Sequence, residues 1–304
     1  MDKYRHPDCP PAVVRIATAD GCLLAADRWE GHVCPVVYAH GFGQTRGSWR
    51  ATAAALARAG HPGLAADARG HGESGWNPAG LAYSPDLFID DLITVTAGFE
   101  QAPVLVGASM GGLFGLIAES RWPGLFRAMV LVDITPRWEA AGVQRILDFM
   151  GAHPEGFASA EAAVDAIASY LPHRTRKSAD SLQGLLRSDA DGRLHWHWDP
   201  RLLGDIGHDA SRHQATIAEA ARRVSCPVLL VSGGRSDLVS DRTIAEFMDL
   251  VPHARYVRLP GATHMVAGDD NDAFTTTVMQ YLDTLPAIAT DGLSATSHLT
   301  GAFQ

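Results

Sequence analysis

The stretch from Val104 to Arg121 constrains the fold of this 304-residue chain more than any other. A short apolar run ends abruptly at the pentapeptide Gly-Ala-Ser-Met-Gly, and a helix-like segment follows without a loop. Gly107 and Gly111 lack Cβ atoms, so a strand and a helix can approach closely around Ser109. A strand, a tight turn and a helix with a serine at the apex is the arrangement in which this pattern exposes a hydroxyl. The Met110 amide then lies at a helix N-terminus, where developing negative charge is favoured.

Short apolar runs alternate with helix-like segments on both sides of this turn. Such alternation indicates a parallel sheet that helices cover on both faces. Near the N-terminus, Asp20-Gly21 is a hairpin signal between two alternating runs. The expected strands are the run from Val104 together with Val13–Thr18, Cys22–Trp29, Pro35–Ala39, Gly63–Ala66, Ala128–Val132, Pro227–Ser232 and Arg255–Leu259.

The alternation stops after Asp133 and resumes only near Pro227. We interpret residues 134–213 as a helical cap inserted into a core formed by residues 1–133 and 214–285. Residues 286–304 are rich in Ala, Thr, Ser and Gly, and we expect a mobile tail there. Within the cap we expect no regular strand, and helices over Glu139–Met150, Ala160–Leu171 and Ser181–Arg187.

Composition excludes several classes of protein. A net charge of −9 and a pI near 5.8 argue against a nucleic-acid partner. No apolar run reaches the length of about 20 residues that a membrane-spanning helix needs. The four cysteines show no metal-ligand spacing and the first residues contain no apolar signal core, so a cytoplasmic protein is the simplest interpretation. A homodimer is an assembly that the sequence allows.

Five features together carry a resemblance to a known family. They are the Gly-x-Ser-x-Gly turn at Ser109, His40-Gly41-Phe42-Gly43, Asp67-x-Arg69-Gly70-His71-Gly72, Asp237 after a strand, and His264 after the last strand. With these motifs the chain resembles α/β-hydrolase-fold serine hydrolases over nearly its whole length, including the chain order Ser, Asp, His. The resemblance implies an α/β fold, with a mostly parallel eight-stranded sheet flanked by helices and a helical cap inserted after the sixth strand. Val132–Pro136 is also similar to a segment of small esterases and thioesterases in this family.

The chemistry that this resemblance implies needs three side chains. A serine hydroxyl is a poor nucleophile at neutral pH, so Ser109 requires an adjacent base, and His264 is the expected one. An acid must orient that histidine and stabilise its charged form. We expect Asp237 in this role, while Asp133 is the alternative acid because it also follows a strand at the same edge of the sheet.

The oxyanion hole is expected from the backbone amides of Phe42 and Met110. Gly41 and Gly43 would let the Phe42 segment approach the substrate closely. His40 and His71 are bases by residue type, but we expect both to hold their loops by hydrogen bonding.

The cap should set specificity. Its large apolar groups include four candidates for contact with an acyl substrate, although an inserted layer must also bury its own face. His195 and His197 alternate with two tryptophans, but no acidic or thiolate cluster accompanies them, so we expect neither a metal nor a cofactor. The four candidate substrate-binding residues are Trp138, Phe149, Trp196 and Trp198.

The expected activity is hydrolysis of a small-molecule carboxylic ester, thioester or lactone through an acyl-enzyme on Ser109. Two alternatives stay open. The same triad can serve carbon–carbon bond hydrolysis or perhydrolysis, and a ligand receptor of this fold would retain the triad with slow turnover. Serine at position 109 argues against haloalkane dehalogenase and epoxide hydrolase activity, since those relatives use Asp there.

Overall fold

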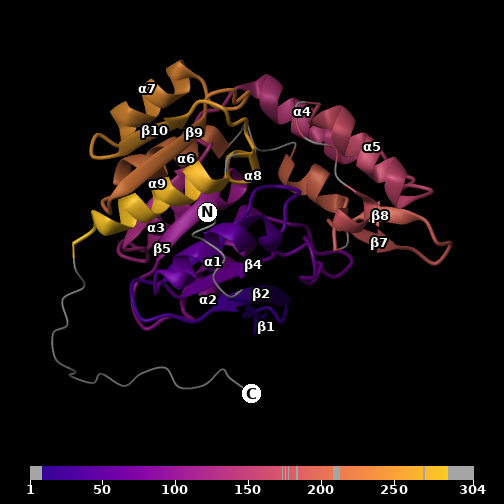
Figure 1. Ribbon diagram of the computed structural model, residues 1–304, viewed down its shortest axis with the longest axis horizontal. Helices are drawn as coiled ribbons and strands as arrows, with labels where there is room; N and C mark the ends of the chain where they lie inside the picture. Colours follow the sequence, from indigo (N-terminus) through magenta and orange to yellow (C-terminus); the bar gives the residue numbers. More distant parts are fainter. Residues whose placement is uncertain are drawn as a thin grey trace, which may run out of the picture.

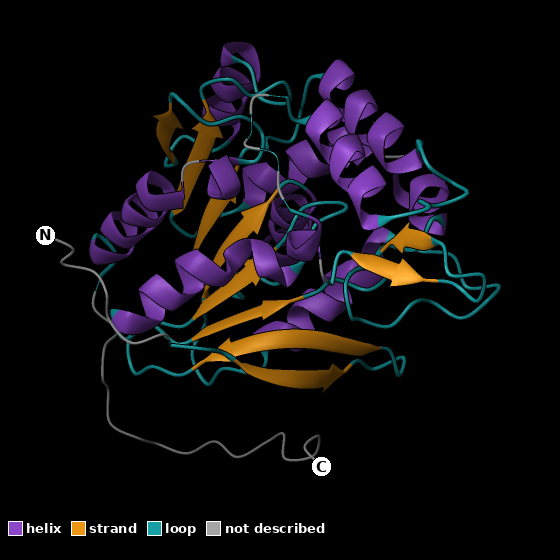
Figure 2. Cartoon of the chain, turned by 45° about the vertical axis from the view of Figure 1, so that its right-hand side comes forward, coloured by secondary structure: helices purple, strands orange, loops and turns teal. Residues whose placement is uncertain are grey.

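The structure is a computed structural model that describes residues 9–172, 174, 176, 178–182, 184–207, 213–269 and 271–286. An eight-stranded sheet lies at its centre in the order β1-β2-β4-β3-β5-β6-β9-β10 (Figures 1 and 2). β2 runs antiparallel to both of its neighbours, and all other pairs among β3 to β10 in this sheet are parallel. The expected mostly parallel sheet is therefore confirmed. The strands are β1 (Ala12–Ala17), β2 (Leu23–Trp29), β3 (Val36–Ala39), β4 (Gly63–Ala66), β5 (Val104–Ala108), β6 (Ala128–Val132), β9 (Val228–Gly233) and β10 (Arg255–Leu259).

Helices cover both faces of the sheet. Successive strand residues point to opposite sides, so both faces carry apolar side chains that need a covering layer. Val36 and Tyr38 belong to the hydrophobic cluster under α1 and α9, whereas Val37 belongs to the cluster under α2, α3, α6 and α7. Burial on both faces explains why the parallel strands are nearly continuous apolar runs. The core helices are η1 (Arg46–Trp49), α1 (Arg50–Arg58), α2 (Pro85–Thr96), α3 (Met110–Arg121), α6 (Gln214–Arg223), α7 (Asp241–Leu250), α8 (Val266–Asp269) and α9 (Asn271–Asp283).

The segment between β6 and α6, for which we keep the name cap, projects from one side of the molecule (Figures 1 and 2). The expectation of a cap without strands is wrong, because β7 and β8 form an antiparallel hairpin. Its turn contains Asp191-Gly192, and Gly192 adopts a φ of 79° that favours glycine. The segment Ser181–Arg187, expected as a helix, is instead shared between η2 and β7. The cap elements are α4 (Ala140–Gly151), α5 (Ala160–Tyr170), η2 (Ala179–Leu182), β7 (Leu186–Ser188), β8 (Leu194–Trp196) and η3 (Leu203–Gly207).

Two further expectations concern the C-terminal tail and membrane-spanning helices. The expected mobile tail, residues 286–304, lies outside the described residues from position 287 onward. In the described part of the chain, none of the helices combines the length and apolar character that crossing a bilayer requires.

Candidate active site

The Ser109 turn joins β5 directly to α3. Ser109 has φ 45° and ψ −117°, a conformation that costs a non-glycine residue about 1–3 kcal/mol. The surrounding structure holds it there, since its amide donates to Val132 O at 3.1 Å and its carbonyl accepts from Leu113 N at 3.0 Å. The Met110 amide at the start of α3 has no hydrogen-bond partner among the described residues. The turn therefore presents a serine hydroxyl beside an unpaired N–H at a helix N-terminus.

Two glycines permit this geometry by removing side chains at points of backbone contact. A Cβ atom at Gly107 would lie 2.8 Å from Gly112 Cα, and one at Gly111 would lie 2.5 Å from Ala39 O. Both distances are shorter than a real Cβ tolerates, so α3 can reach β5 and β3 only with glycine at these positions. This is the close approach that the sequence predicted.

His264 lies in the loop after β10 and is oriented by a buried carboxylate. Its Nδ1 lies 2.8 Å from Asp133 Oδ2, and the Asp133 side chain is completely buried at the end of β6. The same carboxylate accepts from Gly233 N at 2.8 Å and from Ser236 Oγ at 2.5 Å. Three donors around one buried carboxylate fix its direction toward the imidazole.

We expected Asp237 to be the hydrogen-bond partner of His264, and this is wrong. The alternative acid, Asp133, makes that hydrogen bond. Asp237 pairs instead with Arg145 of α4 at 2.8 Å, and its side chain is 42 % exposed. The residue that faces inward from this loop is Ser236, whose Oγ donates to Asp133 and accepts from the amides of Leu238 and Val239. Because adjacent residues point in different directions here, Asp237 is turned toward the cap.

The loop after β3 contains the second expected oxyanion donor. Three of its amides are already occupied: Gly41 N donates to Gln44 Oε1, Gly43 N to His71 Nε2, and Gln44 N to Gly41 O, at 3.0, 3.2 and 3.0 Å. Among the described residues, the Phe42 amide has no partner. The loop therefore leaves the Phe42 N–H free beside Ser109, where the Met110 N–H is also free.

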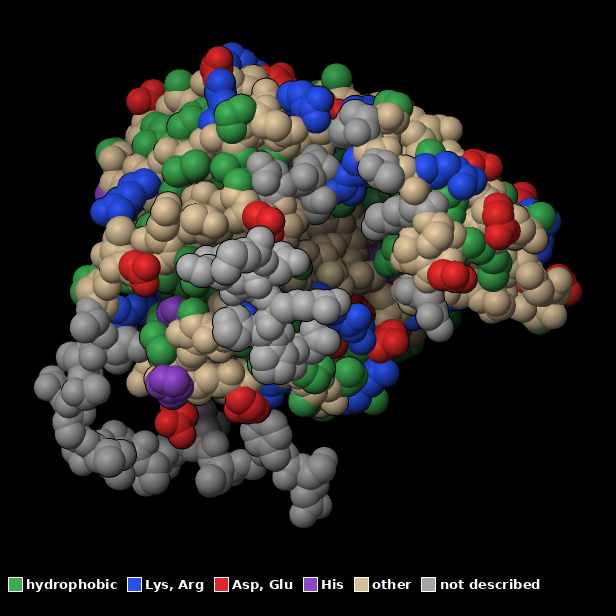
Figure 3. Space-filling model, in the orientation of Figure 1, with side chains coloured by type: hydrophobic (Ala, Val, Ile, Leu, Met, Phe, Trp, Pro, Cys, Tyr) green, Lys and Arg blue, Asp and Glu red, His purple; other side chains and the backbone are tan. Residues whose placement is uncertain are grey.

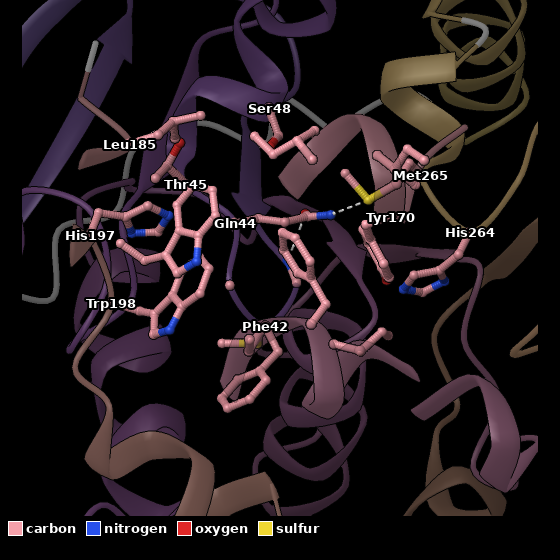
Figure 4. A pocket seen from close by; sticks show the side chains of 18 of the residues that line it. Phe42, Gln44, Thr45, Ser48, Tyr170, Leu185, His197, Trp198, His264 and Met265 are labelled. Atoms are coloured by element: carbon pink, nitrogen blue, oxygen red, sulfur yellow. Dashed lines mark hydrogen bonds between the residues drawn. The ribbon is translucent and has the colours of Figure 1, made fainter. Parts of the chain in front are cut away.

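The space above Ser109 is enclosed by the core and the cap. The surface between these two parts of the molecule is hollowed (Figure 3). A cavity of about 200 Å³ is lined there by both Ser109 and His264. In Figure 4, His264 and Tyr170 lie on one side of this cavity and Trp198 and His197 on the other. Its walls are mainly apolar and aromatic, as is typical of sites for small organic ligands.

Three of the four expected substrate-binding residues line this first cavity. Trp196 stacks on Trp198 with ring centroids 5.2 Å apart, and Phe149 packs against Trp196 at 5.7 Å. Trp138 lines a different cavity, of about 250 Å³, which also reaches Ser109 and Met110. All three tryptophans are largely buried, so they belong to the hydrophobic core as well as to the cavity walls.

Sequence reasoning missed two residues that support this site. Gln44 bridges the Gly41 amide and Met265 Sδ, the latter at 3.1 Å, and so links the loop after β3 to the His264 loop (Figure 4). Ser236 fixes the Asp133 carboxylate. Neither position carried a signal, because a polar residue in a loop is ordinary. Within the described residues, no three His, Cys, Asp or Glu side chains are grouped so that they could hold a metal ion.

Comparison with known proteins assigns the chain to a family. Residues 35–270 match the family model described as alpha/beta hydrolase fold. The chain belongs to the α/β-hydrolase family. It is 32 % identical over 287 residues to an esterase of Mycobacterium tuberculosis, with 90 % of each chain covered. It is 26 % identical over 257 residues to a 3-hydroxybutyrate-oligomer hydrolase of Cupriavidus necator, covering 79 % of this chain and 86 % of that one.

Among solved structures, one of the M. tuberculosis esterase superposes on this α/β hydrolase with a TM-score of 0.72 and 31 % identity. The match covers 92 % of this chain and 94 % of that chain. The agreement in fold and sequence establishes that the protein is an enzyme and a hydrolase.

Proposed function

We propose that this α/β hydrolase cleaves carboxylic esters through an acyl-enzyme on Ser109, with His264 as base and Asp133 as the orienting acid. The observation that supports this most is the arrangement around the Ser109 turn. A strained serine and the His264–Asp133 hydrogen bond meet at one cavity, beside two backbone amides that have no partner among the described residues. The similarity to an esterase and to a hydrolase of hydroxybutyrate oligomers supports an oxygen ester as substrate.

The proposed reaction has two halves. Ser109 Oγ attacks the carbonyl carbon while His264 takes the hydroxyl proton, and the amides of Phe42 and Met110 stabilise the negative oxygen. Collapse of this intermediate breaks the bond to the leaving group, which receives the proton from His264. Water then attacks the acyl-enzyme by the same route and releases the carboxylic acid and Ser109. Asp133 keeps the His264 proton on Nδ1, so that Nε2 is free to accept.

We assign the leaving group and the acyl chain of the ester to different cavities. The leaving group must lie near the histidine that protonates it, and His264 lines the first cavity and not the second. The leaving group therefore occupies the aromatic first cavity. The acyl chain extends past Met110 into the second cavity, whose walls include Leu113 and Trp138. On this assignment, Trp196 and Trp198 contact the alcohol portion.

A panel of p-nitrophenyl esters, a thioester, a lactone and a carbon–carbon-cleavable diketone tests the proposal. We expect steady turnover of the esters and labelling of Ser109 by a fluorophosphonate. Ser109→Ala should abolish both, whereas Ser169→Ala on the exposed face of α5 should change neither. A burst followed by negligible turnover would indicate a receptor, and cleavage of the diketone alone would refute ester hydrolysis.

The state of the cysteines is relevant to the cellular compartment in which the enzyme acts. All four are free, and burial raises the pKa of the Cys22, Cys34 and Cys226 thiols, which lowers their reactivity. Four unpaired thiols, one of them buried and the others partly buried, support a cytoplasmic site of action.

A further inference from the structure

Three buried histidines meet where the cap packs on the loops after β3 and β4: His40 and His71 belong to these two loops, and His197 belongs to the cap. Each accepts a hydrogen bond from a backbone amide: His40 Nε2 from Ala68 N at 2.9 Å, His71 Nε2 from Gly43 N at 3.2 Å, and His197 Nδ1 from Gly72 N at 2.8 Å. The His71 ring centroid lies 5.1 Å from that of His40 and 6.2 Å from that of His197. His40 and His71 belong to the core, whereas His197 follows β8 in the cap.

These contacts require neutral rings. A backbone N–H can only donate, so the ring nitrogen that faces it must carry a lone pair. In His71 the other nitrogen, Nδ1, donates to Arg69 O at 3.0 Å, and in His40 it donates to Gly41 O at 2.8 Å. Burial lowers the pKa of all three rings, that of His197 to about 3. The three rings therefore act as fixed hydrogen-bond acceptors.

The cap holds the loop that carries His71 at three points. Asp199 N donates to Gly70 O at 2.8 Å, and Arg187 Nη2 donates to Gly72 O at 2.5 Å. The third point is the His197 bond to the Gly72 amide. This loop in turn positions His71, which holds the Gly43 amide. A contiguous chain of contacts thus runs from the cap to the residue after Phe42.

We propose that His197 is a positioning residue through which the docked cap fixes the oxyanion loop; this rests on the proposed function, in which the Phe42 amide stabilises the oxyanion. The Phe42 N–H belongs to the peptide between Gly41 and Phe42, whose carbonyl oxygen accepts from His40 Nδ1 at 2.8 Å and from Gln44 N at 3.0 Å. The next peptide, between Phe42 and Gly43, is held by His71 through the Gly43 N–H, so both peptides that flank Phe42 are anchored to this histidine cluster. With the cap histidine absent, the Gly72 amide loses its acceptor, and the loop that supports His71 shifts.

His197→Leu tests this, because leucine fills similar space without an acceptor. We expect kcat/KM on a short p-nitrophenyl ester to fall roughly 10- to 100-fold, less than the 10²- to 10³-fold loss typical when an oxyanion donor is removed outright. Affinity for a trifluoromethyl ketone, which forms a tetrahedral adduct with Ser109, should fall by the same factor. Affinity for the matching methyl ketone, which forms no stable adduct, should stay within about 2-fold of wild type.

Two further variants separate positioning from simple structural loss. In His197→Asn the amide oxygen takes the place of Nδ1 and can accept from Gly72, so this variant should recover most of the lost affinity for the trifluoromethyl ketone. The matched control is His195→Leu in β8, where the ring is more than a third exposed and pairs with Asp189 at 2.9 Å. It should behave as wild type. If His197→Leu does not fold, the ketone comparison on His197→Asn against His197→Gln decides, since glutamine places its amide beyond the Nδ1 position and should show the loss.

Unchanged trifluoromethyl ketone affinity in His197→Leu would overturn the proposal. Equal losses for both ketones would also overturn it, because they would make His197 a wall of the cavity only. The proposed function is judged separately, by turnover and by Ser109 labelling of the wild-type enzyme. Turnover that depends on Ser109, combined with indifference to position 197, would retain the first proposal and reject the second.

Discussion

Replacing Asp133 by Asn should lower kcat severely without unfolding the enzyme. The residue adopts a φ of 48°, which Asn tolerates better than most residues, and the side chains have nearly the same shape. The consequence follows from the donors around the carboxylate. The Gly233 amide, at 2.8 Å, can only donate, so the new amide oxygen must stay on that side. The new NH₂ group then faces His264 Nδ1 and donates to it.

A donor in that place changes the tautomer of His264. Its single proton moves to Nε2, the nitrogen that must accept the proton of Ser109. Turning the amide around would bring two N–H donors together at Gly233, and an unsatisfied buried donor costs about 1–3 kcal/mol. Loss of the orienting aspartate in triads of this kind lowers kcat by roughly 10⁴-fold. We therefore expect a loss of that size for Asp133→Asn, about 5.4 kcal/mol in activation free energy at about 1.36 kcal/mol per tenfold change in rate.

Asp237→Asn is the matched control for this experiment. Its pair with Arg145 is exposed, and such pairs contribute about 0–1 kcal/mol, so turnover should change less than about 5-fold. Both variants are assayed on one activated ester at neutral pH, with thermal unfolding followed in parallel. If Asp237→Asn were the crippled variant while Asp133→Asn kept most of its activity, the assignment of the acid and the tautomer reasoning would both be refuted.

Three other outcomes are expected. Ser109→Ala should lower turnover by roughly 10⁴-fold or more with an unchanged melting temperature, and residual activity near wild type would rule out the serine mechanism. The free energy of unfolding should fall as pH decreases from about 6.5 toward 3. The reason is that His197 is neutral in the folded state with a pKa of about 3 but protonated in the unfolded chain, so the unfolded state binds more protons; His197→Asn should flatten that dependence in denaturant titrations. Trp198→Ala should change relative kcat/KM among leaving groups more than among acyl chains, and the reverse pattern would exchange the roles of the two cavities.

Much of the fold follows from local patterns in the sequence. All eight strands of the central sheet are readable because buried parallel strands are short apolar runs between turn signals. The cap hairpin was missed even though Asp191-Gly192 is the same signal as Asp20-Gly21. The residues after this turn alternate between histidine and tryptophan, and β7 before it is Leu-Arg-Ser, so neither side contains the β-branched residues usual in strands and the turn signal alone did not suggest a hairpin.

The sequence predicts the parts of the site in which a motif fixes the backbone geometry. It does not predict which of two candidate acids faces His264, because that depends on the direction of a side chain. Ser109 and the glycines around it follow from the strand–turn–helix pattern. Asp133 and Asp237 both follow strands, and sequence order favoured Asp237 by resemblance to the family. The direction of a side chain in a loop depends on its neighbours. Here Ser236 takes the inward position, and Arg145, distant in sequence, attracts Asp237 to the surface.

The position of Asp133 at the root of the cap has a consequence for recombination between relatives. The residue that contacts His264 is the last one before the inserted segment begins, so that segment is attached directly to the proposed catalytic acid. A chimera that exchanges caps must place its first crossover after position 133 and must preserve the backbone conformation there. A crossover even one residue earlier would import the donor's residue in place of the acid. By contrast, the loop around Asp237 should tolerate wide variation, provided that a hydroxyl remains at position 236.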